Sequence, residues 1–240
     1  MSVRADYRRL FDVDFEILQN PTVAVKQKQA YLPYWPVPGL IKRSPDRRAV
    51  NTIAYAGRIG KRNIADMFHN DFPNKSAVKG LSFKTIPPQH WHDMSGVDIL
   101  VAIRDFDGGT HKNKPPSKLF NAWLSEVPLV AGADSAFRHL GEPGTDYIRV
   151  TNEGELWEAI YRLSTEPVFY SRLVEAGRAK AASVTHEKIA ETWLSVLEGP
   201  VYEVFEQWKA SHGEVKRRFF FGLADKAADG LSVLKRSMSR

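Results

Sequence analysis

From Asn51 onward, apolar positions come in short runs that alternate with longer amphipathic stretches. The short runs are rich in Val, Ile and Leu, which is typical of strands buried on both faces of a parallel sheet. We predict strands at residues 52–56, 81–86, 97–103, 128–131 and 147–150. Strands that alternate with helices at this spacing predict an α/β fold with a doubly wound, mostly parallel sheet.

The amphipathic stretches predict the helices that connect and follow these strands. Ser117 is expected to cap one of them, and Pro167 to begin another, since proline suits the first turn. In the stretch 153–164 the apolar residues recur at helical spacing on one face. The predicted helices and helical turns are 64–68, 89–94, 117–124, 135–140, 153–164, 167–182 and 186–209.

The first 50 residues have a different pattern. Residues 14–19 and 31–35 predict two strands with no substantial helix between them, and residues 44–46 with their flanking arginines predict a linker. Two strands alone make a poor domain. We therefore expect residues 1–50 to be the remnant of a preceding domain with its linker. Residues 51–199 are then the α/β domain, and residues 200–240 a C-terminal helical tail.

Composition narrows the class of protein. The chain has enough apolar residues for a core and no cysteine, which excludes a disulfide framework and a thiolate zinc site and fits the reducing cytoplasm. No apolar run approaches the roughly 18 residues that span a bilayer. The net charge of +6 favours an anionic partner such as a nucleotide, a phosphate or an acidic membrane. Nucleic acid is not expected, because the basic residues are not interleaved with aromatic ones.

Residues 214–240 combine seven basic and three acidic side chains with an apolar stripe that includes three consecutive phenylalanines. A basic amphipathic helix can lie on anionic lipid, so peripheral membrane contact through residues 214–240 is one interpretation. The other is a terminal helix that packs on the protein's own surface. The sequence leaves both interpretations open.

The loop after the first strand of the α/β region carries Gly57, Arg58, Lys61 and Arg62. In open α/β sheets, ligands bind outside the carboxyl ends of the strands. Glycine lets the backbone approach a ligand, and arginine and lysine neutralise phosphate, so these four are candidate phosphate-binding residues. The spacing fits neither a Walker loop nor a dinucleotide fingerprint. A solvated basic turn is the alternative.

A second candidate lies in the loop at 104–116 and the helix start that follows it. A helix N-terminus with lysines beside it favours bound anions. An asparagine one turn into the helix can hydrogen-bond a sugar hydroxyl. The alternative is a surface loop with solvated lysines before a capped helix. The candidate residues are Arg104, Lys114, Ser117, Lys118 and Asn121.

Acidic and histidine residues suggest two metal sites, neither of which we predict. Asp105 and Asp107 form a DxD pair, which can hold Mg²⁺ or Mn²⁺ beside a nucleotide sugar, but Asp and Gly are equally at home in a tight turn after a strand. His90 and His92 have no third ligand at a recognisable spacing. We therefore predict that no metal is bound.

Several segments, taken in order, resemble one known family. Gly57-Arg58 follows a strand, KPPSKLFNAW at 114–123 runs from loop into helix, and VPLVAG follows at 127–132. The run at 136–181 and the segment ETWLSVLEG at 191–199 complete the order. Over about residues 51–199 the chain resembles the C-terminal, donor-binding half of GT-B fold glycosyltransferases. That resemblance implies a Rossmann-like domain that binds a nucleotide-diphosphate sugar.

The family's motif residues can be carried over only in part. The resemblance implies that Arg58, with Lys61 or Arg62, contacts the diphosphate, and that Lys118 approaches a phosphate. Asn121 takes the place of the acidic residue that contacts ribose. Retaining members have two glutamates where this chain has Asn113 and Asn121, so the donor and the stereochemical outcome stay open.

The resemblance also implies a mechanism and a reaction. Cations and a helix N-terminus stabilise the charge on the departing nucleoside diphosphate, so no metal or other cofactor is required. The expected reaction is hexosyl transfer from a nucleotide sugar to a glycan or polysaccharide acceptor, with the catalytic residues unknown. A complete member has a larger acceptor domain, so we expect an N-terminally truncated chain or one that a partner completes. The alternatives are a metal-dependent GT-A enzyme using Asp105 and Asp107, and a non-catalytic interaction module.

Overall fold

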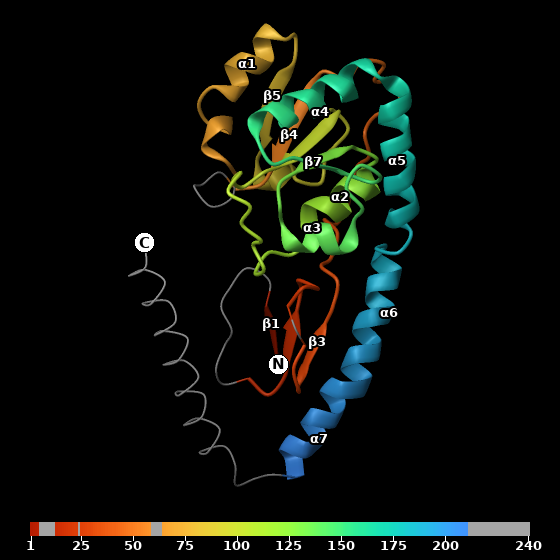
Figure 1. The fold of residues 1–240 in the computed structure, drawn as a ribbon. Helices are drawn as coiled ribbons and strands as arrows, with labels where there is room; N and C mark the ends of the chain where they lie inside the picture. The colour runs from red at the N-terminus through yellow and green to blue at the C-terminus, as the bar shows by residue number, and fades with distance from the viewer. Residues whose placement is uncertain (5–12, 24, 59–63, 211–240) are drawn as a thin grey trace, which may run out of the picture.

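The computed structural model describes residues 1–4, 13–23, 25–58 and 64–210, and its centre is a five-stranded, all-parallel sheet (Figure 1). The strands lie in the order β5-β4-β6-β7-β8. The prediction of a parallel α/β sheet is confirmed, and every strand falls within its predicted segment. The bounds are Thr52–Ala56 for β4, Ser82–Ile86 for β5, Ile99–Ala102 for β6, Leu129–Ala131 for β7 and Ile148–Arg149 for β8.

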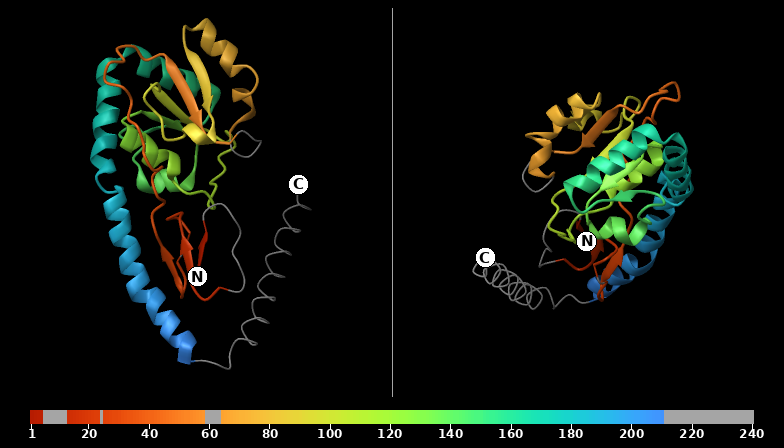
Figure 2. Two further views of the ribbon diagram at one scale, coloured as in Figure 1. Left: turned by 180° about the vertical axis from the view of Figure 1, so that it is seen from behind. Right: turned by 45° about the horizontal axis from the view of Figure 1, so that its top comes forward.

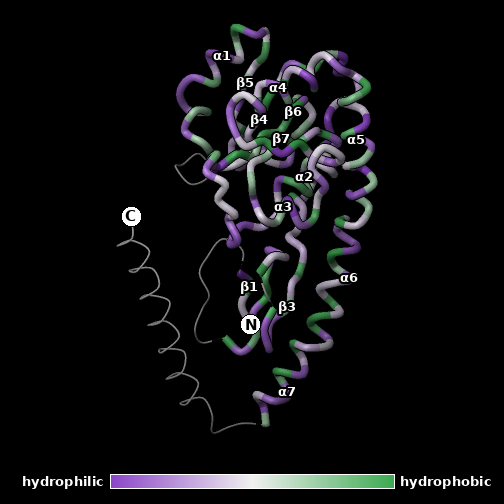
Figure 3. The backbone as a smooth tube through the Cα atoms, in the orientation of Figure 1, coloured by the Kyte–Doolittle hydropathy of each residue, from purple (hydrophilic) through white to green (hydrophobic). Residues whose placement is uncertain are grey.

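The strands of this sheet bury both faces, because consecutive side chains point to opposite sides. In β4, Ile53 and Tyr55 join one core cluster and Ala54 joins the other. The residues of β6 and β7 alternate between the clusters in the same way. Figure 3 shows these two strands as almost continuously hydrophobic. A run of apolar residues without polar alternation is therefore what this central position requires.

Helices cover both faces of the sheet, which makes the fold doubly wound. Residues of α2, α3 and the start of α6 pack in one cluster, and residues of α1 and α4 pack in the other. Helix α5 reaches both clusters, since Phe169 near its start lies in one and Ala181 at its end lies in the other. The helices are α1 Phe72–Val78, α2 Ser117–Ser125, α3 Ser135–Leu140, α4 Glu153–Thr165, α5 Pro167–Ala181 and α6 His186–Val196.

Three helical predictions need correction. The segment 64–68 forms only a 3-10 turn at Asp66–Phe68, and the helix α1 that follows was not predicted. The helical turn expected at 89–94 is a 3-10 turn at Pro88–His90. Ser117 does not cap α2: Pro116 occupies the cap position, and its carbonyl accepts from the amides of Leu119 and Phe120.

The N-terminal residues form a second, three-stranded parallel sheet in the order β1-β2-β3 (Figure 1). The strands are β1 Ser2–Arg4, β2 Glu16–Leu18 and β3 Gln29–Tyr31. The predicted strand at 14–19 is confirmed as β2, but the one at 31–35 is wrong, because the strand ends at Tyr31. Strand β1 was not predicted. Whether this sheet is the remnant of a larger domain stays a prediction.

The long helix predicted at 186–209 is interrupted and runs back along the N-terminal sheet. A π-helical segment, Leu197–Val201, separates α6 from α7 at Tyr202–Ala210, with Gly199 outside helical geometry and Pro200 lacking a backbone donor. Figure 2 shows from behind that α6 and α7 extend alongside the small sheet. Among the described residues, no helix has the length and apolar composition that a membrane span needs.

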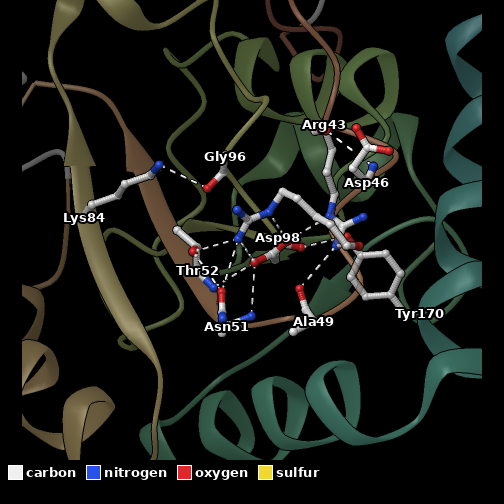
Figure 4. Close-up of polar contacts among 11 residues, drawn as sticks. Arg43, Asp46, Ala49, Asn51, Thr52, Lys84, Gly96, Asp98 and Tyr170 are labelled. Atoms are coloured by element: carbon white, nitrogen blue, oxygen red, sulfur yellow. Dashed lines mark hydrogen bonds and ion pairs between the residues drawn. The ribbon is translucent and has the colours of Figure 1, made fainter.

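The linker between the two sheets is fixed by a buried carboxylate, Asp98, which directly precedes β6 (Figure 4). Its side chain is fully buried and accepts hydrogen bonds from Arg43, Arg47 and the amides of Asn51 and Thr52. Burial alone would raise the pKa of Asp98, but these donors outweigh it and lower the pKa to about 2. The arginines of the predicted linker are therefore structural anchors, at the amino end of the sheet.

Candidate functional site

The candidate residues gather at the carboxyl edge of the large sheet, opposite Asp98. Gly57 and Arg58 follow β4, Arg104 follows β6, and Asp134 follows β7 just before α3. All these strands are parallel, so the loops after them open on the same edge. Lys61 and Arg62 lie outside the described residues, so their predicted phosphate contacts stay predictions.

Tyr55, near the end of β4, joins the two predicted anion-binding segments. The Nζ atom of Lys118, in the first turn of α2, lies 5.2 Å from the centre of the Tyr55 ring. The Tyr55 hydroxyl donates to the carbonyl of Arg58 over 3.4 Å. The loop after β4 and the start of α2, distant in sequence, therefore meet around one aromatic ring. Sequence reasoning missed Tyr55, although an aromatic residue just before Gly57 was visible.

Gly57 is required by this arrangement. A Cβ atom at this position would lie 2.5 Å from the Tyr55 hydroxyl oxygen and 2.6 Å from the ring carbon that bears it. Tyr55 is buried and cannot move aside. Burial raises the pKa of the Tyr55 hydroxyl to about 12, so it stays protonated at neutral pH. Glycine thus lets the backbone pass close to the Tyr55 ring, and its predicted approach to a phosphate stays a prediction.

The start of α2 presents amide groups at the same place. A helix leaves its first amide groups without partners inside the helix, and its dipole makes this end partly positive. Ser117 is the first helical residue and Lys118 the second. The carbonyl of Lys114, in the preceding loop, accepts a hydrogen bond of 2.8 Å from Asn20 Nδ2. Ser117 and Lys118 therefore lie at the helix end where an anion is favoured, although the Ser117 hydroxyl makes no capping bond, and the predicted contact of Lys114 with an anion stays a prediction.

Arg104 forms an ion pair with Asp134. Its Nε atom lies 3.1 Å from Asp134 Oδ2, and both side chains are mostly buried. His111 Nε2 lies 3.1 Å from Asp105 Oδ2 and 3.8 Å from Asp134 Oδ1. The loop after β6 is thus tied to the loop after β7 by the Arg104–Asp134 ion pair and by His111, which lies near both carboxylates. Arg104 positions Asp134 at the site's rim, and its predicted phosphate contact stays a prediction.

Asp105 and Asp107 form a turn. Asp107 Oδ1 accepts from the amide of Gly109 over 2.9 Å, which is the tight-turn interpretation of the DxD pair. Burial raises the pKa of Asp105, a hydrogen bond with Asp107 raises it further, and His111 opposes both. Within the described ranges, no group of three or more acidic or histidine side chains is arranged to hold a metal ion.

Asn121, one turn into α2, holds the segment that connects the two sheets. Its side chain is buried, and Oδ1 accepts a hydrogen bond of 3.2 Å from the amide of Val37 in the linker. In this structure Asn121 therefore anchors the chain that leads from the small sheet. A contact of Asn121 with ribose stays a prediction and would require its side-chain amide to bind both the Val37 backbone and the ribose.

The small sheet meets the large one at the same rim. Asn20, in the loop after β2, donates through Nδ2 to Ser135 Oγ over 3.1 Å, and Thr22 Oγ1 lies 2.9 Å from the same oxygen. Ser135 begins α3, beside Asp134. Carboxyl-end loops of both parallel sheets therefore face one another. Sequence reasoning did not find this contact, because it joins residues more than a hundred positions apart.

Comparisons with known proteins rest on structure alone, since no family model and no curated protein matches the sequence. Solved structures do match. HepE of Anabaena, solved with UDP-glucose, superposes with a TM-score of 0.56 at 13% identity, over 76% of this chain and 64% of that one. The sucrose-phosphate synthase of Thermosynechococcus elongatus gives 0.58 at 14% identity, over 84% and 60%. The chain has the fold of GT-B glycosyltransferases.

A third GT-B neighbour extends this comparison. The pneumococcal O-GlcNAc transferase GtfA, solved with UDP and GlcNAc, gives a TM-score of 0.56 at 13% identity, over 80% of this chain and 47% of its own. The chain thus spans less than two thirds of each of these structures. The resemblance drawn from the sequence is confirmed at the level of the GT-B fold. A metal-dependent GT-A arrangement around Asp105 is not what the fold indicates.

Proposed function

We propose that this chain binds a nucleotide-diphosphate sugar and supplies the donor-binding half of a glycosyltransferase. The observation that carries the proposal is the meeting of Gly57-Arg58 with the start of α2 around Tyr55. It places a basic loop, a lysine and a helix N-terminus at the carboxyl edge of a parallel sheet. Two structural neighbours, HepE solved with UDP-glucose and GtfA solved with UDP and GlcNAc, support a uridine nucleotide as the first to test.

The proposed chemistry is electrostatic. Glycosyl transfer leaves a nucleoside diphosphate carrying the charge of the broken bond. Lys118 and the first amides of α2 would hold the diphosphate and stabilise that charge, with Arg58 approaching from the loop after β4. The Tyr55 ring holds the Lys118 ammonium beside this loop by a cation–π contact. Arg104 is assigned a smaller part, because Asp134 already balances its charge.

The acceptor is placed on the side of the small sheet. The loop after β2 faces the donor edge through Asn20 and Thr22, so a sugar bound at this edge would lie near the junction of the two sheets. Transfer of a hexosyl group to a glycan or polysaccharide remains part of the proposal, as do cytoplasmic localisation and a partner that completes the acceptor site. The membrane contact predicted for residues 214–240 lies outside the described residues.

Titration calorimetry of the folded chain with UDP, GDP and their sugar conjugates tests donor binding. We expect one nucleotide class to bind with one site per chain, and Lys118→Ala to weaken that binding. Lys84→Ala is the matched control, since Lys84 Nζ donates to the Gly96 carbonyl beside the start of β6, at the opposite edge. Absence of binding by every nucleotide would refute the proposal.

A non-catalytic module is the second candidate, favoured by the small size of the N-terminal sheet. A measurement of released nucleotide distinguishes such a module from an enzyme. Slow release of UDP or GDP from the sugar nucleotide that binds, abolished by Lys118→Ala, supports a transferase. Tight binding with no release, in the presence of glycan acceptors as well, supports the non-catalytic module.

A further inference from the structure

Asp105 and Asp134 follow neighbouring strands at the carboxyl edge of the large sheet, and Asp105 is the more exposed of the two. Asp105 lies three residues after β6 ends, and its side chain is 33% exposed. The side chain of Asp134, after β7, is 5% exposed, and Arg104 balances its charge. Of the two carboxylates, that of Asp105 is therefore the one that a molecule bound at this edge can contact.

His111 holds the Asp105 carboxylate in place. Its Nε2 atom lies 3.1 Å from Asp105 Oδ2. The backbone of His111 has a φ of 45°, in the left-handed region that residues other than glycine seldom adopt. The amide of Ser135, the first residue of α3, donates to the carbonyl of the preceding Thr110 over 2.8 Å and so fixes this part of the loop. Conformations of this kind persist where the surrounding structure determines them, and they cluster at functional sites.

The loop after β6 lies between the proposed donor edge and the small sheet. Burial has the largest effect on the pKa of the Tyr55 hydroxyl, and the charges of Arg104 and Asp134 act on it next, so this ion pair lies near the Tyr55 ring. Farther along the loop, the Lys114 carbonyl accepts from Asn20 of the small sheet over 2.8 Å. Figure 1 shows the loop, in yellow-green, extending from the large sheet toward the small one. An acceptor that enters between the sheets therefore meets this loop beside the donor.

We propose that Asp105 is the general base of the transfer reaction and that His111 is the residue that positions it. The inference rests on the proposed function and names the group that receives the acceptor's proton. The acceptor oxygen bonds to the anomeric carbon, and the bond from that carbon to the diphosphate oxygen breaks, with its electron pair leaving on the nucleotide. The acceptor's hydroxyl proton passes to the Asp105 carboxylate and from there to solvent. A single displacement of this kind inverts the anomeric configuration.

The surroundings of Asp105 suit this role. Burial raises the pKa of Asp105, a hydrogen bond with Asp107 raises it further, and the charge of Asp134 acts in the same direction, while His111 opposes them. A carboxylate with a raised pKa accepts a proton more readily than an ordinary one. The same shift means that the ionised group costs stability, a cost that catalytic groups commonly carry and that a purely structural aspartate has no reason to keep.

Asp105→Asn separates catalysis from structure. Asparagine keeps the size of the side chain and an oxygen that can accept from His111, but it cannot take up a proton. The variant should melt no lower than wild type and bind UDP-glucose and GDP-mannose as wild type does. Release of nucleotide from the sugar nucleotide that binds, with water as the acceptor, should fall about a hundredfold. Asp46→Asn is the control, because Asp46 is exposed in the linker beside Arg47, at the opposite edge, and should release nucleotide at the wild-type rate.

His111→Gln tests the positioning residue. Release requires ionised Asp105, so the rate should fall as the pH falls through the pKa of that carboxyl. His111 lowers this pKa against the effects of Asp107 and Asp134, so its removal should move the acidic limb of the rate profile to higher pH. A purely structural role would change the stability without moving this limb, and that result would overturn the assignment of His111.

The outcomes distinguish this inference from the proposal of donor binding. Binding of a nucleotide sugar with equal release by Asp105→Asn and wild type, or with no release by either, overturns the base and leaves donor binding standing. Release of α-glucose from UDP-α-glucose, seen by proton NMR before the sugar equilibrates, also overturns the base, since β-glucose is expected. Absence of binding by every nucleotide sugar overturns both proposals.

Discussion

The ammonium group of Lys118 lies 5.2 Å from the centre of the Tyr55 ring. Tyr55 lies near the end of strand β4 and Lys118 lies in the first turn of α2, so this contact brings together the two segments that a diphosphate would bridge. A cation above an aromatic face is held without losing its charge. The contact therefore holds the Lys118 ammonium near the loop after β4.

Removal of the Lys118 charge should weaken nucleotide binding. Lys118→Ala is expected to raise the Kd for the bound nucleotide about tenfold, the equivalent of about 1.4 kcal/mol. Tyr55→Phe keeps the ring and should bind nearly as wild type, whereas Tyr55→Leu removes the ring and should approach the Lys118→Ala value. Titration calorimetry compares the nucleotide Kd values of these variants, after thermal unfolding has shown that each has the melting temperature of the wild type. A full effect of Tyr55→Phe would mean that the hydroxyl, not the ring, is what matters.

Gly57 should tolerate no side chain. Gly57→Ala places a Cβ atom in contact with the buried Tyr55 ring, and overpacking of this kind costs about 1–3 kcal/mol of stability. Gly96→Ala is the control, because its Cβ would meet only the flexible end of Lys84 at 3.3 Å. Urea denaturation measures both. Equal stabilities for the two variants would contradict the close approach at Gly57.

Asp98 should make the free energy of unfolding depend on pH in the acidic range. The pKa of Asp98 is about 2 in the folded chain against an ordinary value of 3.8. Because the pKa of Asp98 is lower in the folded chain than in the unfolded chain, its ionised form stabilises the fold at any pH above the unfolded pKa. This stability is lost as the pH falls from about 4 toward 2. The loss amounts to about 2 kcal/mol for this residue.

Asp98→Asn provides the matching variant. It should be destabilised by about 3–5 kcal/mol at neutral pH, since two partly buried arginines lose their counter-charge. The deficit should shrink as the pH falls from about 4 toward 2, because the wild-type chain then loses the stability that its ionised Asp98 provides. Urea denaturation across this pH range measures it, and a deficit that is constant with pH would rule out the ionised pair as its cause.

Asp105 should change the stability of the fold with pH in the opposite direction to Asp98. Burial and Asp107 raise the pKa of Asp105, so its ionisation opposes folding. A raised carboxyl pKa gives stability that is present below the unfolded value and lost as the pH rises through the folded value. Asp105→Asn should therefore gain stability relative to wild type between pH 3 and pH 7. A relative loss over that range would show that the pair with His111 outweighs burial.

Much of the large sheet could be predicted from sequence, because strands such as β6 and β7 must be apolar on both faces to lie in its centre. Their order along the chain also located the carboxyl edge, and with it Gly57, Arg58 and Lys118. Helix α1 escaped prediction because it is short and has proline in its first turn. The local sequence favoured Ser117 as the N-cap of α2. It could not show that Pro116 is the N-cap and that its carbonyl accepts the first hydrogen bonds of the helix.

The contacts that organise the rim could not be predicted, since they join distant segments. Asn121 fitted a ribose-binding position by motif, yet its side chain holds the Val37 amide of the linker. Arg104 fitted a phosphate-binding position as well, and its side chain pairs with Asp134. The arginines that flank residues 44–46 were predicted only to belong to a linker, and Asp98, the single acid in an apolar run, pairs with two of them. In each case the partner lies far along the chain and could not be found from the local pattern.

The location of a bound nucleotide tests the central claim most directly. A crystal structure of the chain with UDP, or with the nucleotide that calorimetry selects, would show where the diphosphate lies. We predict diphosphate oxygens within hydrogen-bond distance of the first amides of α2, with Lys118 and the Gly57-Arg58 backbone on either side. A nucleotide bound at any other place, with the Lys118 ammonium still over Tyr55 and no phosphate near it, would contradict the account.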